Sequence, residues 1–468
     1  MASMDEQSTK ERPQPPYPEA VGHPLTHSIR SMPDVLAFRD RALAGHDIAR
    51  TYFFGPGDVY NLTHPSHVRR VLIDDRDTFS KSEDFHIAFD DGLVAVEGEQ
   101  WQQQRRILQP LFSRDSVRSY GDGICEQIRR RTGSWSHGDR IDLQAEMKRL
   151  TLEVLFATLF GRELELNGDS ELRSAAGQLK EWFAPTSYPL PTWIPTPARW
   201  RFKRGRRRLR TAADELLAEA AGGPSPDEAE DLLSLLVGIR QRRGDDGDVL
   251  ADEQLRDQVV TLIFAGHETT AATLALALFE IARRPVVRAE FHREIDRLDG
   301  PPTPADVPDL EVTERLIRET LRLYPPVYIL PRESAREVTV DGYRIPADVP
   351  VWLGIRQIHR DGRFYDAPKR FRPERWRDGS DDRPDFAYAP FGGGPRLCIG
   401  RQFALLEAKL ALATIGRRFT LSRAGEDTGE RANTSIDDSP IEHTTEPPLS
   451  ADMTLRLASG TDFYLRER

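Results

Sequence analysis

The sequence predicts a helix-rich α+β fold that forms a single domain over residues 21–468, preceded by a flexible N-terminal segment over residues 1–20. Helical periodicity dominates from Trp101 to Leu323, whereas short β-branched stretches lie near the N-terminus, at 337–351 and near the C-terminus. No internal repeat divides the chain, and no Gly-rich dinucleotide fingerprint opens a helix after a strand. We therefore expect one domain without a fused reductase.

Three segments are predicted to be loops within this domain. They are rich in proline or in polar and acidic residues, and they cover 184–197, 299–308 and 424–447. We assign no functional residue to the last of them.

Charge and composition exclude several classes of protein. A net charge of −10 argues against a nucleic-acid-binding protein, whose surface would be basic. The first thirty residues contain charged residues and prolines but no apolar run typical of a signal peptide or membrane anchor. Cys125 and Cys398 are the only cysteines, so a disulfide framework is not expected. These observations favour a cytoplasmic protein without a transmembrane anchor.

A Gly-rich stretch around Cys398 carries the strongest chemical signal. Three consecutive glycines precede the cysteine, and a helical pattern follows it. Glycine permits unusual backbone angles, and amides at the start of a helix stabilise a thiolate. The pattern therefore favours a deprotonated ligand, although a lone cysteine beside a glycine turn is more often a small buried residue.

This stretch resembles the haem-binding loop of the cytochrome P450 family, whose fixed positions correspond to Phe391, Gly394, Arg396, Cys398 and Gly400. The resemblance implies the cytochrome P450 fold, with a long central helix over the haem. It also implies haem b (iron protoporphyrin IX) as cofactor, with Cys398 as the axial ligand of the iron. A cysteine thiolate donates electron density that promotes cleavage of the O–O bond.

A long apolar segment from Val259 to Ala282 is interrupted near its centre by polar residues. Polar groups there would be costly in lipid, so a buried core helix is expected instead of a transmembrane helix. The interruption resembles the central-helix signature of cytochromes P450. This implies that Glu268 and Thr269 deliver protons beside the oxygen-binding face of the haem, and that Gly266 leaves space there. A threonine that only bonds to its own helix is the alternative for Thr269.

A Glu-x-x-Arg pair, Glu319 and Arg322, lies on an apolar helix that ends before a double proline. The same spacing recurs elsewhere in the chain, where a surface ion pair is the default interpretation. The context resembles the Glu-x-x-Arg helix of the family, which implies Arg375 as a third partner. We expect this trio to serve structure and haem incorporation instead of catalysis.

The resemblance also implies which side chains bind the haem propionates and line the substrate pocket. The expected propionate ligands are Trp101, Arg105, Arg332 and Arg396, with ordinary solvated side chains as the alternative for Arg105 and Arg332. The expected pocket residues carry almost no charge and are Phe85, Val260, Ile263, Phe264, Ala265, Val327, Ile329 and Leu330. An apolar lining predicts an apolar small-molecule substrate.

These features predict a haem-thiolate monooxygenase that activates dioxygen and hydroxylates or epoxidises an apolar organic substrate. The chain shows no flavin or iron–sulfur motif, so two electrons are expected from a separate ferredoxin or flavin reductase. We expect that protein to dock near the cysteine loop, where Arg396 and Arg401 offer positive charge.

Two alternatives remain from the sequence. A peroxide-using or isomerising haem-thiolate enzyme would not need the proton delivery that Glu268 and Thr269 suggest. A haem-binding sensor without catalysis would not consume oxygen when it is reduced in the presence of substrate.

Overall fold

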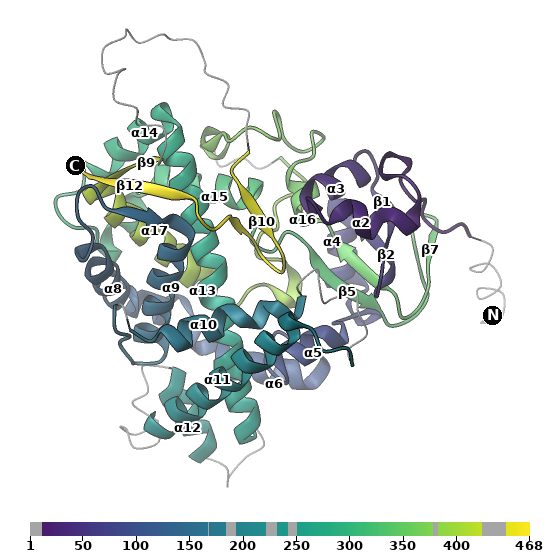
Figure 1. Ribbon diagram of the computed structural model, residues 1–468, viewed down its shortest axis with the longest axis horizontal. Helices are drawn as coiled ribbons and strands as arrows, with labels where there is room; N and C mark the ends of the chain where they lie inside the picture. Colours follow the sequence, from purple (N-terminus) through teal and green to yellow (C-terminus); the bar gives the residue numbers. More distant parts are fainter. Residues whose placement is uncertain are drawn as a thin grey trace.

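The computed structural model describes residues 12–166, 168–183, 193–220, 232–241, 250–377, 382–423 and 446–468. Helices make up most of the described chain and small sheets lie beside them, so the predicted mostly helical α+β class is confirmed (Figure 1). The predicted loops at 184–197 and 424–447 fall mostly outside the described residues. The third, 299–308, joins two helices and ends in the 3₁₀ turn Pro304–Asp309.

The helices form a bundle beside a smaller, sheet-containing region (Figure 1). In the first half of the chain they are α2 (His27–Ser31), α3 (Val35–Ala42), α4 (Pro65–Arg69), α5 (Glu83–Phe89), α6 (Gly98–Leu108), α7 (Arg114–Ser119), α8 (Gly121–Gly133), α9 (Leu143–Leu159), α10 (Ser170–Gln178) and α11 (Pro197–Ala220). In the second half they are α12 (Leu232–Gln241), α13 (Asp252–Arg283), α14 (Pro285–Ile295), α15 (Glu311–Leu323), α16 (Ile355–His359) and α17 (Arg401–Arg418).

A five-stranded sheet has the order β1-β2-β8-β5-β3, in which β2 and β8 are parallel and the other pairs antiparallel. Its strands are β1 (Ile48–Phe53), β2 (Gly57–Leu62), β3 (Phe79–Ser80), β5 (Leu330–Ser334) and β8 (Pro350–Leu353). In β8, Val351 and Leu353 are buried in the core under the sheet, whereas Pro350 and Trp352 line a cavity. This alternation is the period-2 pattern of a half-buried strand.

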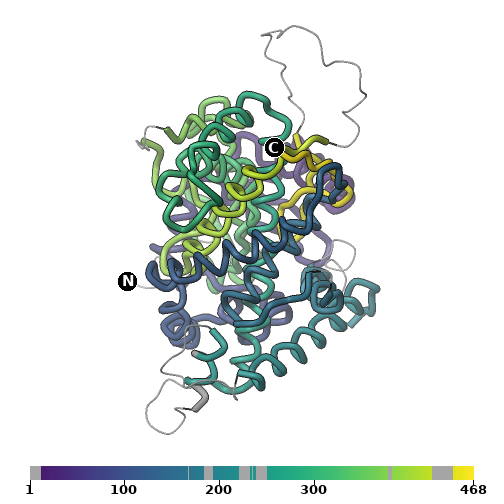
Figure 2. The backbone as a smooth tube through the Cα atoms, turned by 90° about the vertical axis from the view of Figure 1, so that its left-hand side faces the viewer, coloured from purple at the N-terminus to yellow at the C-terminus, as the bar shows by residue number. Residues whose placement is uncertain are grey.

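The remaining strands close the fold at its two ends. They are β4 (Arg140–Asp142), β6 (Val338–Val340), β7 (Tyr343–Ile345), β9 (Phe419–Arg423), β10 (Leu449–Ala451), β11 (Leu455–Leu457) and β12 (Asp462–Glu467). Strand β12 lies between β4 and β9, with Asp462 opposite Asp142, so the C-terminal strands lie against a much earlier segment (Figure 2). Strands β6 and β7 form one hairpin, and β10 and β11 form another.

Helix α13 is the central element of the largest hydrophobic core. The side chain of Gln254 accepts a hydrogen bond from the Ala251 amide at its start, and the helix ends where Arg284 becomes extended before Pro285. It is the one described helix that is long and apolar enough to cross a membrane, and 83% of its most apolar 18-residue window is buried inside the protein. The segment is thus a buried core helix, as its polar centre predicted.

The described part of the N-terminal segment lies against the sheets. The Pro13 carbonyl accepts a hydrogen bond from the Arg344 amide, and the Pro16 carbonyl accepts one from the Arg50 amide. Residues 12–20 of the segment predicted to be flexible therefore contact β7 and β1, while residues 1–11 lie outside the described residues.

Candidate active site

The loop before α17 presents Cys398 on a constrained backbone. Gly392 and Gly394 have positive φ angles of 72° and 63°. A Cβ atom at Gly394 would lie 2.7 Å from the Leu72 carbonyl oxygen, so the close approach of these two segments requires glycine. The Cys398 amide then donates to the Phe391 carbonyl at 3.1 Å, which closes the loop.

The Cys398 side chain is exposed, although many protein atoms surround its thiol group. Burial raises its pKa, while the Gly400 amide and the Arg105 and Arg401 guanidinium groups act in the opposite direction. A coordinated metal cation would complete the deprotonation that these neighbours favour.

The four predicted propionate ligands lie beside this loop. Arg105 donates to the Leu397 carbonyl at 2.8 Å. The Arg396 guanidinium lies 4.5 Å from the centre of the Trp101 ring and 3.4 Å from Glu97 Oε1. Arg332 is buried on β5, where burial and the nearby Arg396 lower its pKa to about 10. The structure thus brings Trp101, Arg105, Arg332 and Arg396 to one side of Cys398.

Lys81 joins this group although the sequence analysis did not identify it. Burial, followed by Arg332 and Arg396, lowers the pKa of Lys81 well below its usual value. Glu97 is the carboxylate that opposes these three cations. A single lysine in a loop carries no periodic or motif signal, so only the fold shows where it lies.

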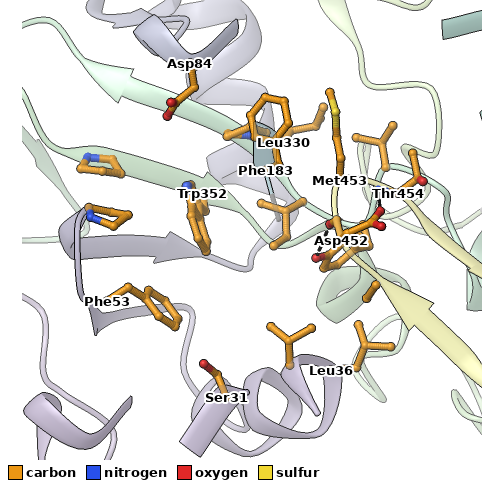
Figure 3. A pocket seen from close by; sticks show the side chains of 18 of the residues that line it. Ser31, Leu36, Phe53, Asp84, Phe183, Leu330, Trp352, Asp452, Met453 and Thr454 are labelled. Carbon is orange, nitrogen blue, oxygen red and sulfur yellow. Dashed lines mark hydrogen bonds between the residues drawn. The ribbon is translucent and has the colours of Figure 1, made fainter. Parts of the chain in front are cut away.

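One face of α13 borders a cavity of about 1780 Å³ (Figure 3). Thr261, Phe264, Ala265 and Thr269 line it, as the spacing of one helix face requires. The predicted pocket residues that line it are Phe85, Phe264, Ala265, Val327, Ile329 and Leu330. Val260 and Ile263 are buried in the core and lie outside its lining, because they fall on another side of the helix.

The rest of the cavity wall comes from segments far apart in the sequence. Figure 3 shows Phe53 from β1 and Trp352 from β8 on the left, Leu36 from α3 at the bottom, and Met453 from the β10–β11 turn on the right. These residues share no sequence motif, and only the tertiary fold brings them together. Their apolar surfaces extend the predicted apolar lining.

Thr269 and Gly266 both lie on the central helix, and their contacts can be compared with the sequence-based expectations. Thr269 Oγ1 donates to the Ala265 carbonyl at 2.9 Å, yet its side chain borders the cavity. Both the alternative and the functional interpretation of Thr269 are therefore compatible with its position. A Cβ at Gly266 would lie 2.7 Å from Leu155 Cδ1, so this glycine leaves space for α9 and not for a ligand.

Glu268 is buried among cations. Its carboxylate lies 2.8 Å from Lys148 Nζ and 3.7 Å from Lys180 Nζ. Burial alone would raise the pKa of Glu268, but Lys148, Lys180 and His267 outweigh it and lower the pKa to about 2. Burial lowers the pKa of His267, whose Nδ1 lies 2.6 Å from the Ile263 carbonyl oxygen, which fits a structural histidine.

The loop between α5 and α6 contacts both α13 and α11 through its acidic residues. Asp90 pairs with Arg206 and Arg210 of α11, and the Asp91 amide donates to Asp257 Oδ2 at 3.3 Å. Burial and the neighbouring Asp90 carboxylate raise the pKa of Asp257 to about 6. A Cβ at Gly92 would lie 1.9 Å from Thr261 Oγ1, so this loop packs directly on the helix.

The Glu319–Arg322 pair is fully buried and holds the segment that precedes the cysteine loop. Arg322 Nη2 lies 2.8 Å from Glu319 Oε1, and Arg375 Nε lies 3.1 Å from the same oxygen. Arg322 also donates to three carbonyls, of His359, Pro368 and Arg370, and Trp376 donates to Glu319. The structure therefore brings the predicted trio together and adds Trp376, which the spacing of the motif did not indicate.

A buried carboxyl group on α17, Glu407, lies beside Thr270 of α13. Burial raises its pKa well above the usual value, because the charged form is disfavoured away from water. It lies within an apolar helical pattern, and the sequence analysis did not identify it.

Comparison with known proteins agrees with this geometry. The family model described as Cytochrome P450 matches residues 46–441. The chain is 35% identical to the "Cyclooctat-9-en-7-ol 5-monooxygenase" of Streptomyces melanosporofaciens, over 78% of this chain and 81% of that one. It is 33% identical to the "Pentalenene oxygenase" of Streptomyces avermitilis, over 83% and 87%.

A solved structure supports the same assignment. The heme domain of cytochrome P450DA aligns over 98% of this chain and 99% of that chain, with a TM-score of 0.81 and 26% sequence identity. The cysteine loop, the buried Glu319–Arg322 pair and the central helix of this chain thus belong to a fold that the two chains share over nearly their whole length. The chain belongs to the cytochrome P450 family and is a cytochrome P450 monooxygenase.

Proposed function

We propose that this monooxygenase holds haem b through Cys398 and hydroxylates or epoxidises an apolar, terpenoid-like substrate in the 1780 Å³ cavity. The observation that carries the proposal is the position of the cationic group. Arg332 and Lys81 line the apolar cavity and also lie beside Arg396 of the cysteine loop. A ligand with an anionic edge and an apolar body fits between them.

The residues present fit this cofactor. Haem b carries two propionates, and the group formed by Lys81, Arg332, Arg396 and Arg105 has one opposing carboxylate, Glu97. Such a buried excess of positive charge is costly unless anions pair with it. We infer that Trp101 and these cations bind the propionates. Bound to the thiolate, the haem would supply reductive activation of dioxygen.

Protons reach the site through α13 in this proposal. Thr269 lines the cavity, and rotation of its hydroxyl away from the Ala265 carbonyl would let it donate a hydrogen bond there. Glu268 is the adjacent residue, and its partner Lys148 has a side chain that is 24% exposed, which gives contact with solvent. We infer that Glu268 takes up protons from the solvent side and that Thr269 positions them at the cavity face.

The substrate class rests on the cavity and on two relatives. The names of those relatives denote an unsaturated alcohol, cyclooctat-9-en-7-ol, and an alkene, pentalenene. Leu330, Phe264 and Met453 offer the apolar surface that such a molecule would contact. Screening of terpenes, steroids and fatty acids for a change in the haem spectrum tests this choice, and a response to highly charged compounds alone would contradict it.

Electrons come from a separate ferredoxin or flavin reductase in this proposal, and we place both proteins in the cytoplasm. The expected docking residue Arg396 is partly buried and contacts Trp101 and Glu97. Arg114, Arg118 and Arg401 are exposed and have no carboxylate partner within the described part of the chain. We infer that these three arginines face the electron donor.

The decisive experiment is the spectrum of the reduced protein with carbon monoxide. Absorption at the position of thiolate-ligated haem supports the proposal, and the absence of a Soret band contradicts it. Product formation should then require a redox partner, NAD(P)H and dioxygen. Turnover with hydrogen peroxide alone, at the same rate, would instead favour the peroxide-using alternative.

A further inference from the structure

The Glu268 carboxylate shares its cations with a second carboxylate from the other end of the chain. Lys180 Nζ lies 3.7 Å from Glu268 Oε1 and 3.6 Å from Asp452 Oδ2. Arg456 lies 4.0 Å from Glu268 Oε1 through Nε and 2.6 Å from Asp452 Oδ1 through Nη1. Two cations therefore bridge α13 and the β10–β11 hairpin.

The cluster has a small excess of positive charge. Lys148, Lys180 and Arg456 oppose Glu268 and Asp452, while burial lowers the pKa of the neighbouring His267 and so disfavours its charged form. Without Asp452, three cations would face one carboxylate. Because a carboxylate surrounded by cations is a poor proton acceptor, the second carboxylate limits how strongly the cations hold Glu268 in its charged form.

Asp452 also lies at the cavity. Asp452, Met453 and Thr454 form the β10–β11 turn, and all three line the cavity wall (Figure 3). Thr454 Oγ1 donates to Glu268 Oε1 at 3.3 Å, which ties the turn to the carboxylate directly. A ligand that presses on this turn therefore acts on the groups that surround Glu268.

We propose that Asp452 is a positioning residue for proton delivery: it draws Lys180 and Arg456 away from Glu268, so that contact of substrate with the β10–β11 turn governs how readily Glu268 takes up and passes protons. The inference rests on the proposed function of Glu268. It adds a residue nearly two hundred positions later in the chain. The Asp452 side chain pairs with Lys180 and Arg456 and accepts a hydrogen bond from the Thr454 amide, and it has no described contact with Thr269.

The first test compares Asp452→Asn with Asp452→Glu in the haem-loaded enzyme. Asparagine keeps the size of the side chain and an oxygen for the Thr454 amide, which donates to Asp452 Oδ1 at 3.2 Å, but removes the charge. Product formation should fall roughly tenfold in Asp452→Asn, less than the 10²–10⁴-fold typical for complete loss of a proton-transfer group. The solvent deuterium isotope effect should rise, because proton transfer becomes slower. Asp452→Glu should restore most of both.

The matched control is Asp462→Asn, which removes another carboxylate paired with an arginine, Arg140, on the surface formed by β12 and β4. It should change neither rate nor isotope effect. The carbon monoxide spectrum should stay as in wild type in Asp452→Asn, since the charge is lost from the ion pairs and not from the residues around Cys398.

A double-mutant cycle then separates positioning from a merely structural role. In a Glu268→Gln background, Asp452→Asn should cause no further loss, because the group through which it acts has been removed. An equal fold-loss in both backgrounds, or an Asp452→Asn enzyme with wild-type rate and isotope effect, overturns the inference. Failure of the wild-type protein to show thiolate-ligated haem would instead contradict the proposed function itself.

Discussion

Two regions of this molecule are organised differently. The cysteine side comprises the residues around Cys398 and Glu319, and the cavity side comprises the residues that line the cavity. Around Cys398 and Glu319 the contacts are short, buried and specified by local motifs. The cavity wall is assembled from α3, β1, α5, β5, β8, α13 and the β10–β11 turn, which share no motif. The cysteine side can therefore be identified from the spacing of residues in the sequence, whereas the residues of the cavity side come together only in the folded structure. We therefore expect substitutions on the cysteine side to affect haem binding and stability, and substitutions on the cavity side to affect turnover.

The largest effect is expected from Cys398→Ser. A hydroxyl is a far weaker donor than a thiolate, so the protein should lose haem or bind it without thiolate spectral character, and activity should be lost completely. Cys125→Ser is the matched control, because Cys125 is buried and its thiol donates only to the Pro302 carbonyl. The carbon monoxide difference spectrum checks both variants, and unchanged turnover in Cys398→Ser would remove the assignment.

Glu319→Gln should be the next most severe change. It leaves Arg322, which is fully buried, without its carboxylate, and breaking a buried pair in this way costs about 3–5 kcal/mol. Glu290→Gln is the control: Glu290 pairs with Arg315 and Arg377 but is partly exposed, so about 1 kcal/mol or less is expected. Denaturant unfolding and the ratio of haem to protein measure the difference. Equal losses in the free energy of unfolding would show that the buried Glu319–Arg322 pair contributes no more than a surface ion pair.

A smaller and more selective effect is expected on the cavity side from Thr269→Ala. Haem content and substrate affinity should persist, while the product formed per NAD(P)H falls roughly tenfold and hydrogen peroxide rises, because a proton-positioning hydroxyl is lost. Thr273→Ala removes the same type of helix hydrogen bond one turn later, where the side chain lies outside the cavity lining. Comparable loss of product per NAD(P)H in both variants would show that the hydrogen bond from the threonine hydroxyl to the helix carbonyl is responsible, and not the position of the hydroxyl at the cavity.

The smallest expected effect concerns the dependence of stability on pH at Asp257. Burial raises the pKa of its carboxyl to about 6, above the unfolded value of about 3.9. The resulting stabilisation is present below pH 3.9 and is lost as pH rises through 6. In Asp257→Asn this dependence should vanish, so the stability of wild type relative to the variant should grow by roughly 1 kcal/mol per pH unit between pH 6 and 4. Thermal unfolding across that interval tests it; a constant difference would contradict the assignment.

Much of the helical fold and of the cysteine side was predictable, because each depends on local pattern. The apolar run of α13 and the spacing of Glu319 with Arg322 are properties of adjacent residues. Lys81 was not predictable, since a single lysine has no periodic signal and its charge matters only beside Arg332 and Arg396. Asp452 was not predictable for a related reason. It interacts with Glu268 through Lys180, and these three residues lie on separate segments that meet only in the fold.

Val260 and Ile263 show the limit of reasoning from composition. Both are apolar and belong to the helix that borders the cavity, so they match the expected lining. The structure buries them in the core, because only every third or fourth residue of α13 faces the cavity. Choosing the face of a helix needs a partner surface, which the sequence does not identify.

The scarcity of lysine in this chain has a practical consequence for attaching the enzyme to other materials. Only seven of its 65 basic residues are lysines, and three of them, at positions 81, 148 and 180, lie at the active site with restricted access. Among the described residues, Lys203 and Lys369 are the exposed lysines. Among the lysines that the structure describes, amine-directed dyes, cross-linkers or resin couplings should therefore react first at Lys203 and Lys369, so that the enzyme can be labelled or immobilised while its interior lysines stay unmodified.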